Sequence, residues 1–504
     1  MSWSKARRRL AWRLALIAVA VPLAFIARPA FHLVRTGWKD REEREALPAA
    51  EVDDASRMNR TPVAEVWPIP GGRAEAESQL AALLARARRD GSRVSIAGAR
   101  HSMGGHTIYP QGIIVDMRPF RAMEFDEGAR ILRVQAGATW AEVIPFLDAL
   151  GYSVAVMQSN NSFTVGGSIS VNCHGWAYDQ PPISSTVASL RLMKADGSIA
   201  RCSRVENAEL FSLALGGYGL LGVILDVELR VVPNERYKLE QFVVPVDEAL
   251  ATFEREVGKR QGVRMGYARM NVAPARLFDE VIINLFSLES SEPPPKLAPD
   301  ELASLRRAVF RGSVGSDYGK ELRWDAETHL QPLLGGTVCS RNQLLNEDVE
   351  VFENRSRGTT DILHEYFVPR LSVGRFVTLA RDVIRRSGAD LLNVTIRSVR
   401  EDPDTVLRYA DQDMLALVML FNQKRSEEGE RTMESLTREL IDSALSVGGR
   451  YYLPYRLHAT RGQFHAAYPQ AEEFFRKKRL HDPGEMFQNE LYRRYGSMEA
   501  DGGR

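Results

Sequence analysis

The sequence predicts an α+β protein in which short strands and glycine-rich loops occupy the first half, and longer strands and helices the second. Short β-branched runs alternate with stretches of helical apolar spacing. Glycine-dense loops join strand to strand, and no glycine-x-glycine-x-x-glycine opens a helix, so a regular dinucleotide-binding βαβ unit is not indicated. The second half mixes alternating strands with amphipathic helices, and no internal repeat is evident. This pattern is typical of sheets covered by helices.

The elements of the first half follow from local patterns, taken in chain order. We expect an extended segment at 61–70, helices at 74–89, 140–150 and 210–215, and strands at 94–97, 112–117, 131–135 and 225–232. The turn Ala195-Asp196-Gly197-Ser198 lies between the apolar runs 186–193 and 199–202, which predicts a β-hairpin.

Three glycine-dense segments interrupt these elements at residues 97–106, 162–175 and 216–224. The first joins two strands and can direct several backbone N–H groups at one anion. His101 stands at its apex; the alternative is a glycine turn with an ordinary surface histidine. The second segment suits close backbone approach to a flat or phosphorylated ligand.

In the second half we expect strands at 237–244, 263–272, 281–286, 361–368 and 391–399, with helices at 248–257, 373–386 and 431–445. Residues 290–300 are rich in proline and glutamate, which predicts a surface excursion.

Composition limits the classes of partner and site. The formal net charge of +1 gives no electrostatic case for nucleic acid. Cys173, Cys202 and Cys339 form no CxxC or Cys/His cluster, so we expect no metal site and no disulfide framework.

The N-terminus departs from the average composition. A basic stretch precedes the apolar run Leu14–Ile26, as in an export signal or a signal anchor. We therefore expect residues 1–34 to be a signal peptide or membrane anchor and 35–60 a tether; a buried N-terminal helix is the alternative. The protein is then exported or membrane-anchored, with the side of the membrane left open.

The ordered set AGARHSMGGH, QAGATW, TVGGSISVNCHG, KADGSI and GGYGLLGVILDVELRVVP resembles the FAD-binding domain of the vanillyl-alcohol oxidase / p-cresol methylhydroxylase (PCMH-type) class. The resemblance covers residues 61–234 and implies a two-subdomain FAD-binding domain whose first loop presents backbone N–H groups to the FAD pyrophosphate. The residues it implies around FAD are Ala97, Gly98, Ala99, Arg100, His101, Ser102, Met103, Gly104, Gly137, Thr164, Gly166, Gly167, Ser170, His174, Gly175, Gly222, Val223 and Ile224.

The tail Gly448–Gly496 resembles the sugar-oxidising branch of this class: the alditol oxidases, aldonolactone oxidases and decaprenylphosphoryl-ribose oxidases. The resemblance implies a mixed α+β substrate (cap) domain over 235–450. It also implies a C-terminal segment, 451–496, that returns to the FAD-binding domain and completes the active site.

Two histidines gain roles from the resemblance. His101 falls where covalent relatives bond the flavin 8α-methyl, which implies covalent FAD, although decaprenylphosphoryl-ribose oxidases lack this histidine and bind FAD non-covalently; His106 is the reserve candidate. His174 matches the histidine of a family His-Gly pair that lies beside the isoalloxazine and the substrate. The alternative is a buried histidine whose hydrogen bonds are made within the protein. Ser162 stands where doubly linked relatives carry cysteine, which excludes double attachment.

Five further residues are expected at the reacting centre. Thr395 and Arg397 share one face of a strand, at the place where relatives often have Glu-x-Arg. The resemblance therefore implies that Arg397 is the cationic group for flavin or substrate, and Thr395 departs from the family pattern because it replaces the acid. Glu365 can supply the missing polarity. The family's pocket lysine falls on Tyr455, which could act as a base with a lowered pKa, while Arg456 could instead replace the lysine charge.

The resemblance implies an FAD-dependent oxidoreductase that oxidises a CH–OH group of a polyol, aldonolactone or lipid-linked sugar by hydride transfer to flavin N5. Reduced flavin would pass electrons to O2 or to a membrane quinone or cytochrome; Cys173, in place of a smaller residue, favours the latter. The alternatives are a membrane-associated C=C reductase and a non-catalytic flavin-binding protein.

Overall fold

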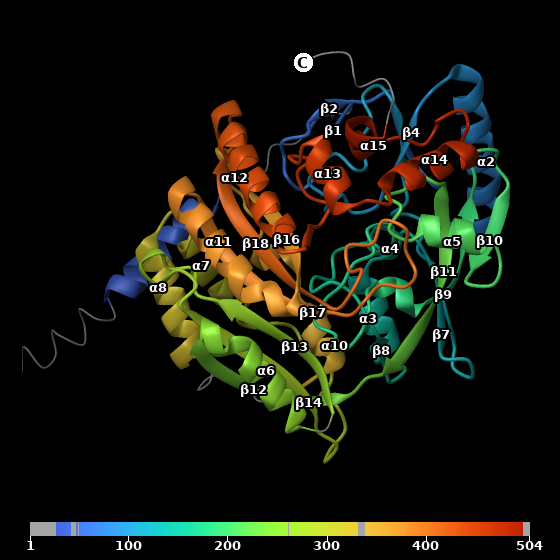
Figure 1. Cartoon of the computed structure of the whole chain (residues 1–504). Coiled ribbons are helices and arrows are strands. Elements are labelled where there is room, and N and C mark those ends of the chain that lie inside the picture. The colour runs from blue at the N-terminus through green and yellow to red at the C-terminus, as the bar shows by residue number, and fades with distance from the viewer. Residues whose placement is uncertain (1–26, 42–46, 49, 261, 331–337, 497–504) are drawn as a thin grey trace, which may run out of the picture.

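The computed structural model describes residues 27–41, 47–48, 50–260, 262–330 and 338–496. It is a mixture of helices and sheets, as the sequence predicts, and its first half contains two larger sheets besides the two-stranded pair of β1 (Glu51–Val52) and β2 (Thr61–Pro62) (Figure 1). The smaller is parallel, in the order β3 (Glu65–Pro68), β5 (Ile113–Asp116), β4 (Val94–Ala97), with α2 (Arg73–Asp90) crossing from β3 to β4. Because α2 buries Leu80, Leu83 and Leu84 on one face, it packs into the core.

The larger sheet of the first half is antiparallel and carries the predicted hairpin. Its order is β10 (Ile199–Ser203), β9 (Val187–Met193), β11 (Val223–Pro233), β7 (Ile131–Gln135), β6 (Met123–Asp126), and β8 (Tyr152–Val154) pairs with β11. Its helices are α3 (Trp140–Asp148), α4 (Val165–Ser170) and α5 (Ala208–Ala214). The short helix α4, inside the second glycine-dense segment, is not among the helices that the sequence predicts.

The second half forms one eight-stranded antiparallel sheet. Its order is β15 (Val338–Ser340), β12 (Arg236–Pro245), β14 (Glu280–Leu288), β13 (Val263–Met270), β17 (Asp390–Val399), β18 (Met414–Lys424), β16 (Thr359–Pro369), β19 (Arg450–Tyr451). The predicted strands are present with shifted ends. The central strand β18 is missing from the prediction because its run is apolar on both faces and lacks alternation.

Helices pack on both faces of this sheet: α11 (Val373–Ser387) on one, and α7 (Ala303–Gly312) and α8 (Asp317–Asp325) on the face toward the first half. The helices of this half are α6 (Ala249–Gly258), α7 (Ala303–Gly312), α8 (Asp317–Asp325), α10 (Arg341–Leu345), α11 (Val373–Ser387) and α12 (Glu427–Leu445). Tyr366 of β16 turns to α11, its ring 5.6 Å from Phe376. The neighbouring Glu365 therefore points to the opposite face, toward the first half.

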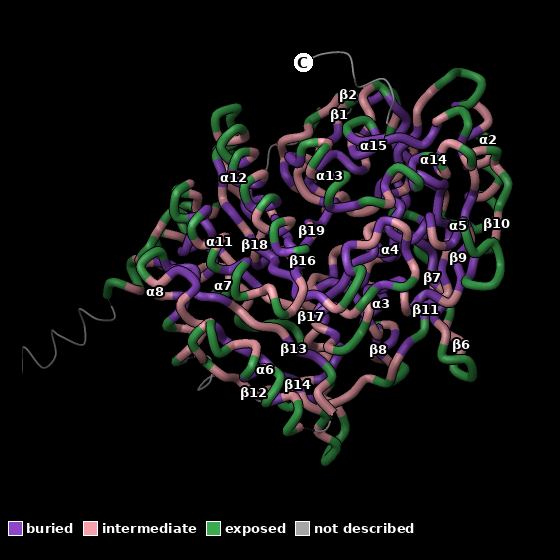
Figure 2. Tube along the Cα trace, in the orientation of Figure 1, coloured by how far each residue is buried: buried purple, intermediate pink, exposed green. Residues whose placement is uncertain are grey.

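The C-terminal segment comprises α13 (Arg461–Ala467), α14 (Ala471–His481) and α15 (Glu490–Tyr495) and lies against the first half. Val94 of β4 donates its N–H to Met486 O (2.8 Å), and Gln488 donates to Val94 O (3.0 Å). The side chain of Asn489 donates to His106 O and Tyr218 O. One hydrophobic core runs through both halves and this segment (Figure 2).

Short elements complete the chain. They are β1 (Glu51–Val52), β2 (Thr61–Pro62), η1 (Ile183–Thr186), η2 (Val246–Glu248), η3 (Pro274–Arg276), η4 (Ala326–Leu330), η5 (Val349–Val351) and η6 (Arg370–Ser372).

The described residues of the N-terminal region pack on the rest of the protein, and the predicted anchor and tether stay predictions. Residues 27–39 form a helix that packs on the second half. Asp54 is buried and accepts a hydrogen bond from Gly105 N, so residues 50–60 pack against the first glycine loop, because this carboxylate satisfies the loop's backbone. The apolar run 14–26 lies outside the described residues. Within the described part of the chain, no helix is both long enough and apolar enough to cross a membrane.

Candidate functional site

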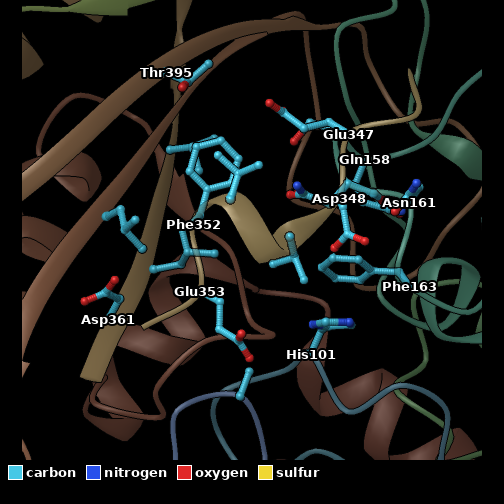
Figure 3. Close-up of a pocket in the computed structure, with 18 of the residues that line it drawn as sticks. His101, Gln158, Asn161, Phe163, Glu347, Asp348, Phe352, Glu353, Asp361 and Thr395 are labelled. Carbon is cyan, nitrogen blue, oxygen red and sulfur yellow. Dashed lines mark hydrogen bonds between the residues drawn. The ribbon is translucent and has the colours of Figure 1, made fainter. Parts of the chain in front are cut away.

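A cavity of about 1960 Å³ lies between the two halves. Ligand pockets for drug-sized molecules usually occupy roughly 300–1,000 Å³, so this space can hold a large nucleotide together with a second ligand. Three regions far apart in sequence meet here: the first and second glycine-dense segments, strands β16 and β17, and residues 452–455 of the C-terminal segment. In Figure 3, His101 lies on one wall and Thr395 on the opposite wall.

The first loop offers unused hydrogen-bond donors to this cavity. Arg100 sits in the left-handed region at φ 58°, a conformation that non-glycine residues adopt rarely and that concentrates at functional loops. Its Nε and Nη2 atoms and Ser102 Oγ are buried without a hydrogen-bond partner in the described structure. Since buried donors are normally satisfied, this loop is suited to an anionic ligand.

His101 lies at the same wall and is held by the second segment. Its ring stacks on Phe163 with centroids 4.1 Å apart, and its Nε2 lies 3.3 Å from Ser162 O. Figure 3 shows the two rings side by side at the cavity. The flat stack fixes the imidazole plane, so that one ring edge is presented to the cavity.

Most of the residues predicted to contact the cofactor line the cavity. These are Gly98, Ala99, Arg100, His101, Ser102, Met103, Thr164, Gly166, Gly167, Ser170, His174, Gly222 and Ile224. Ala97, Gly104, Gly137, Gly175 and Val223 do not line it, and their contact with the cofactor stays a prediction.

The structure gives packing roles to these five residues that do not line the cavity. A Cβ at Gly104 would lie 2.4 Å from Tyr455 O, and one at Gly137 would lie 1.8 Å from Met117 O, so these glycines permit close backbone packing. Gly175 is similar, its Cβ position falling 1.9 Å from Met157 O. Ala97 is buried in a small second core, and Val223 points away from its cavity-lining neighbour Ile224 because side chains alternate along a strand.

The opposite wall holds a buried chain of three polar side chains. Glu365 of β16 lies between His174, whose Nε2 is 2.5 Å from Oε1, and Tyr455, whose hydroxyl donates to Oε2 at 3.0 Å. All three line the cavity. His174 Nδ1 is buried without a partner among the described residues. Glu365 is thus a buried carboxyl group held from both sides at the cavity wall.

The hypothesis of a Tyr455 phenol with a lowered pKa is wrong. Burial, and then the charge of Glu365, raise the pKa of Tyr455 well above its ordinary value, although Arg397 opposes the shift. The phenol is therefore protonated and acts as a donor to Glu365. The group that can accept a proton at this centre is therefore the Glu365 carboxylate.

Arg397 and Thr395 lie on one face of β17, as their spacing predicts, and both line the cavity. Arg397 Nη2 donates to Ser159 Oγ at 3.1 Å, while its Nε is buried without a partner among the described residues. Thr395 accepts a hydrogen bond from Asn393 at 3.0 Å. Arg397 thus brings positive charge and a spare donor to the cavity.

Arg456 is not at the reacting centre, which corrects that prediction. It does not line the cavity; it forms an ion pair with Glu430 and donates to Asn59 Oδ1 at 2.8 Å. Burial raises the pKa of Glu430, but hydrogen bonds from His458 and Arg456 and their charges outweigh it and bring the pKa to about 2. Arg456 neutralises this buried acid.

Sequence patterns missed several residues of the site. Phe163, Ser159 and Tyr452 line the cavity, and the Tyr452 hydroxyl donates to Val171 O at 2.8 Å. Arg269 of β13 also lines it and is salt-bridged to Glu327 at 3.1 Å. Phe163 directly precedes the Thr-Val-Gly run, and Tyr452 is three residues before Tyr455. Closeness to these motifs is the only sequence feature that points to these two residues.

Comparison with known proteins gives the class. Residues 73–203 match the FAD binding domain family. Residues 73–203 therefore carry an FAD binding domain, and FAD is the cofactor. The spare donors of Arg100 and Ser102 fit the anionic pyrophosphate of that nucleotide.

Among its relatives, the chain is similar to L-gulonolactone oxidase of Mus musculus, 30% identical over 183 residues, which are 36% of this chain and 41% of that protein. It is 24% identical to decaprenylphosphoryl-beta-D-ribose oxidase of Mycolicibacterium smegmatis over 82% of this chain and 91% of the relative. It is 23% identical to cytokinin dehydrogenase 4 of Oryza sativa over 86% of both chains. The match to the L-gulonolactone oxidase spans about two fifths of its length.

Proposed function

We propose that this protein is an FAD-dependent oxidoreductase that oxidises a CH–OH group of a polyol, aldonolactone or lipid-linked sugar. The relatives named as oxidases of L-gulonolactone and decaprenylphosphoryl-beta-D-ribose support this class of substrate. The observation that carries the proposal is the buried Tyr455–Glu365–His174 chain on the cavity wall.

Bound FAD supplies the hydride acceptor. The protein's own part is to remove the hydroxyl proton. The substrate hydroxyl gives its proton to Tyr455 Oη while the Tyr455 proton passes to Glu365 Oε2, so the phenol is unchanged overall and the carboxylate ends protonated. His174 Nε2 lies 2.5 Å from Glu365 Oε1 and fixes the orientation of that carboxyl group. Arg397 offsets the negative charge that develops in the site.

The test is anaerobic stopped-flow reduction of the flavin in Glu365→Gln and Tyr455→Phe variants. Because each change breaks the proton path, we expect the reductive rate constant to fall by roughly 10²–10⁴-fold while flavin content is retained. Tyr237→Phe is the matched control, since this buried tyrosine also donates to a glutamate (Glu235, 2.8 Å) but lies outside the cavity. A Tyr455→Phe rate equal to wild type would remove the relay role.

The same experiment addresses the electron acceptor. Cys173 is buried and lines the cavity beside His174, and burial raises the pKa of its thiol to about 12, so it remains a neutral, space-filling side chain. We infer a dehydrogenase that passes electrons to a quinone or cytochrome. On admission of air the yellow colour should return slowly; rapid reoxidation identifies O2 as the acceptor.

A further inference from the structure

The helix at residues 27–39 is fixed to the second half by one of its faces. His32 Nε2 lies 2.8 Å from Gly312 O at the end of α7. The Arg28 guanidinium lies 3.9 Å above the ring of Tyr318 in α8. Just beyond the helix, Asp40 forms an ion pair with Arg307 at 2.6 Å. These contacts leave the opposite face of the helix turned away from the protein.

That outward face is apolar. Phe31, Val34 and Trp38 are 68%, 71% and 76% exposed, and their spacing of three and four residues places them in one stripe. Soluble surfaces carry single exposed apolar residues routinely, but a stripe of this size on a docked helix needs a covering partner.

Basic residues border this stripe. On a helical wheel Arg35 and Lys39 fall beside it, Arg41 follows the helix, and all three are exposed. The only acidic residue in 27–41 is Asp40, which Arg307 neutralises. Large apolar side chains bordered by lysine and arginine are typical of helices that lie in the plane of an anionic membrane.

We propose that helix 27–39 lies in the surface of an anionic phospholipid membrane. Phe31, Val34 and Trp38 insert at the acyl boundary, and Arg35 and Lys39 contact the phosphates. The described part of this helix, residues 27–39, is shorter than the roughly 20 residues that a membrane span needs, which agrees with the in-plane arrangement. In sequence, the apolar run 14–26 leads directly into it.

The cavity extends to this same corner. Pro29 and Leu33 of the helix and Leu302 and Leu305 at the start of α7 line it. The proposed arrangement therefore brings that end of the cavity to the lipid headgroups, where an amphiphilic sugar or alcohol would be met. This last step rests on the proposed function; the membrane contact does not.

The test is co-sedimentation of the full chain with phosphatidylcholine vesicles, with and without phosphatidylglycerol. A variant with Phe31, Val34 and Trp38 all changed to serine should bind the anionic vesicles at least about ten-fold more weakly. The matched control changes Val205, Leu371 and Leu480, which are exposed apolar residues elsewhere, to serine and should bind like wild type. Flavin content checks that each variant is folded.

A second readout separates this helix from the apolar run before it. In a protein that carries Trp3→Phe and Trp12→Phe, brominated lipids should quench tryptophan fluorescence, and adding Trp38→Phe should remove most of that quenching. Equal vesicle binding by the stripe variant, or quenching independent of Trp38, overturns the proposal. The proposal is also overturned if the stripe variant loses only the ability to self-associate in the absence of lipid, because a second copy of the chain then covers the stripe.

Discussion

At the residue scale, His101 is the candidate for covalent attachment of the cofactor. The stack on Phe163 and the contact with Ser162 O fix its ring at the cavity. We infer that His101 forms a covalent bond to the flavin 8α-methyl, as the resemblance to covalent relatives implies. His106, the reserve candidate, also lines the cavity, and burial lowers its pKa to about 4, so its ring is neutral.

Acid precipitation tests the covalent bond. We expect the yellow colour of wild type to stay with the precipitated polypeptide, and that of His101→Ala to pass into the supernatant, because the variant keeps only non-covalent contacts. Absorbance of pellet and supernatant is the measurement. Colour that leaves wild-type protein completely shows that the bond is absent.

Residue identity predicts this site only partly. The loop residues from Gly98 to Met103, predicted to bind the cofactor, and the pair Thr395 and Arg397 all line the cavity, because loop position and strand alternation are local properties. The state of Tyr455 is not local. Its protonation depends on burial and on Glu365, ninety residues away in sequence, which no spacing reveals.

At the element scale, β16 serves two purposes. Its cavity face presents Glu365, while His364 points to the opposite face, with Nε2 3.3 Å from Thr437 of α12. Burial, and then the nearby His458, lower the pKa of His364 to about 3, although Glu430 opposes the shift. This histidine is therefore neutral in the folded protein throughout the ordinary pH range.

The buried His364 predicts how stability depends on pH. Unfolded, it has its ordinary pKa of 6.5, so between pH 6.5 and about 3 only the unfolded chain binds this proton. Stability contributed by this group is complete above pH 6.5 and falls by roughly 1.4 kcal/mol per pH unit below it. Thermal melts of His364→Asn should therefore show a shallower loss of Tm on acidification.

His465→Asn is the control, because His465 is exposed on α13. Its pH dependence should match wild type. Parallel Tm curves for all three proteins would contradict the account of a neutral, buried His364.

Most elements could be predicted locally, since the 3.6 and 2.0 periodicities that define α12 or β17 lie within the segments themselves. The same reasoning fails for β18, which is buried on both faces between β16 and β17. It also fails for α4, where glycine and serine weaken the helical pattern and the Thr164 hydroxyl, accepting from Gly167 N, helps to begin the helix.

At the scale of the whole molecule, the cavity depends on contacts between segments far apart in the chain. Met486 and Gln488 form backbone hydrogen bonds with Val94 of β4. The Asn489 side chain donates hydrogen bonds to His106 O, in the loop that follows β4, and to Tyr218 O. Gly104 permits the backbone of Tyr455 to approach. These contacts join the first loop to the reacting centre, and the sequence could suggest them only through family resemblance.

The most direct measurement is an anaerobic substrate screen that follows the flavin absorbance of the purified full chain. We expect a yellow protein that is bleached by a polyol, aldonolactone or sugar, with the bleaching slowed in Glu365→Gln. Bleaching by NADPH but by no alcohol would contradict the account in favour of a reductase. A yellow protein bleached by neither would make it a flavin-binding protein without this chemistry.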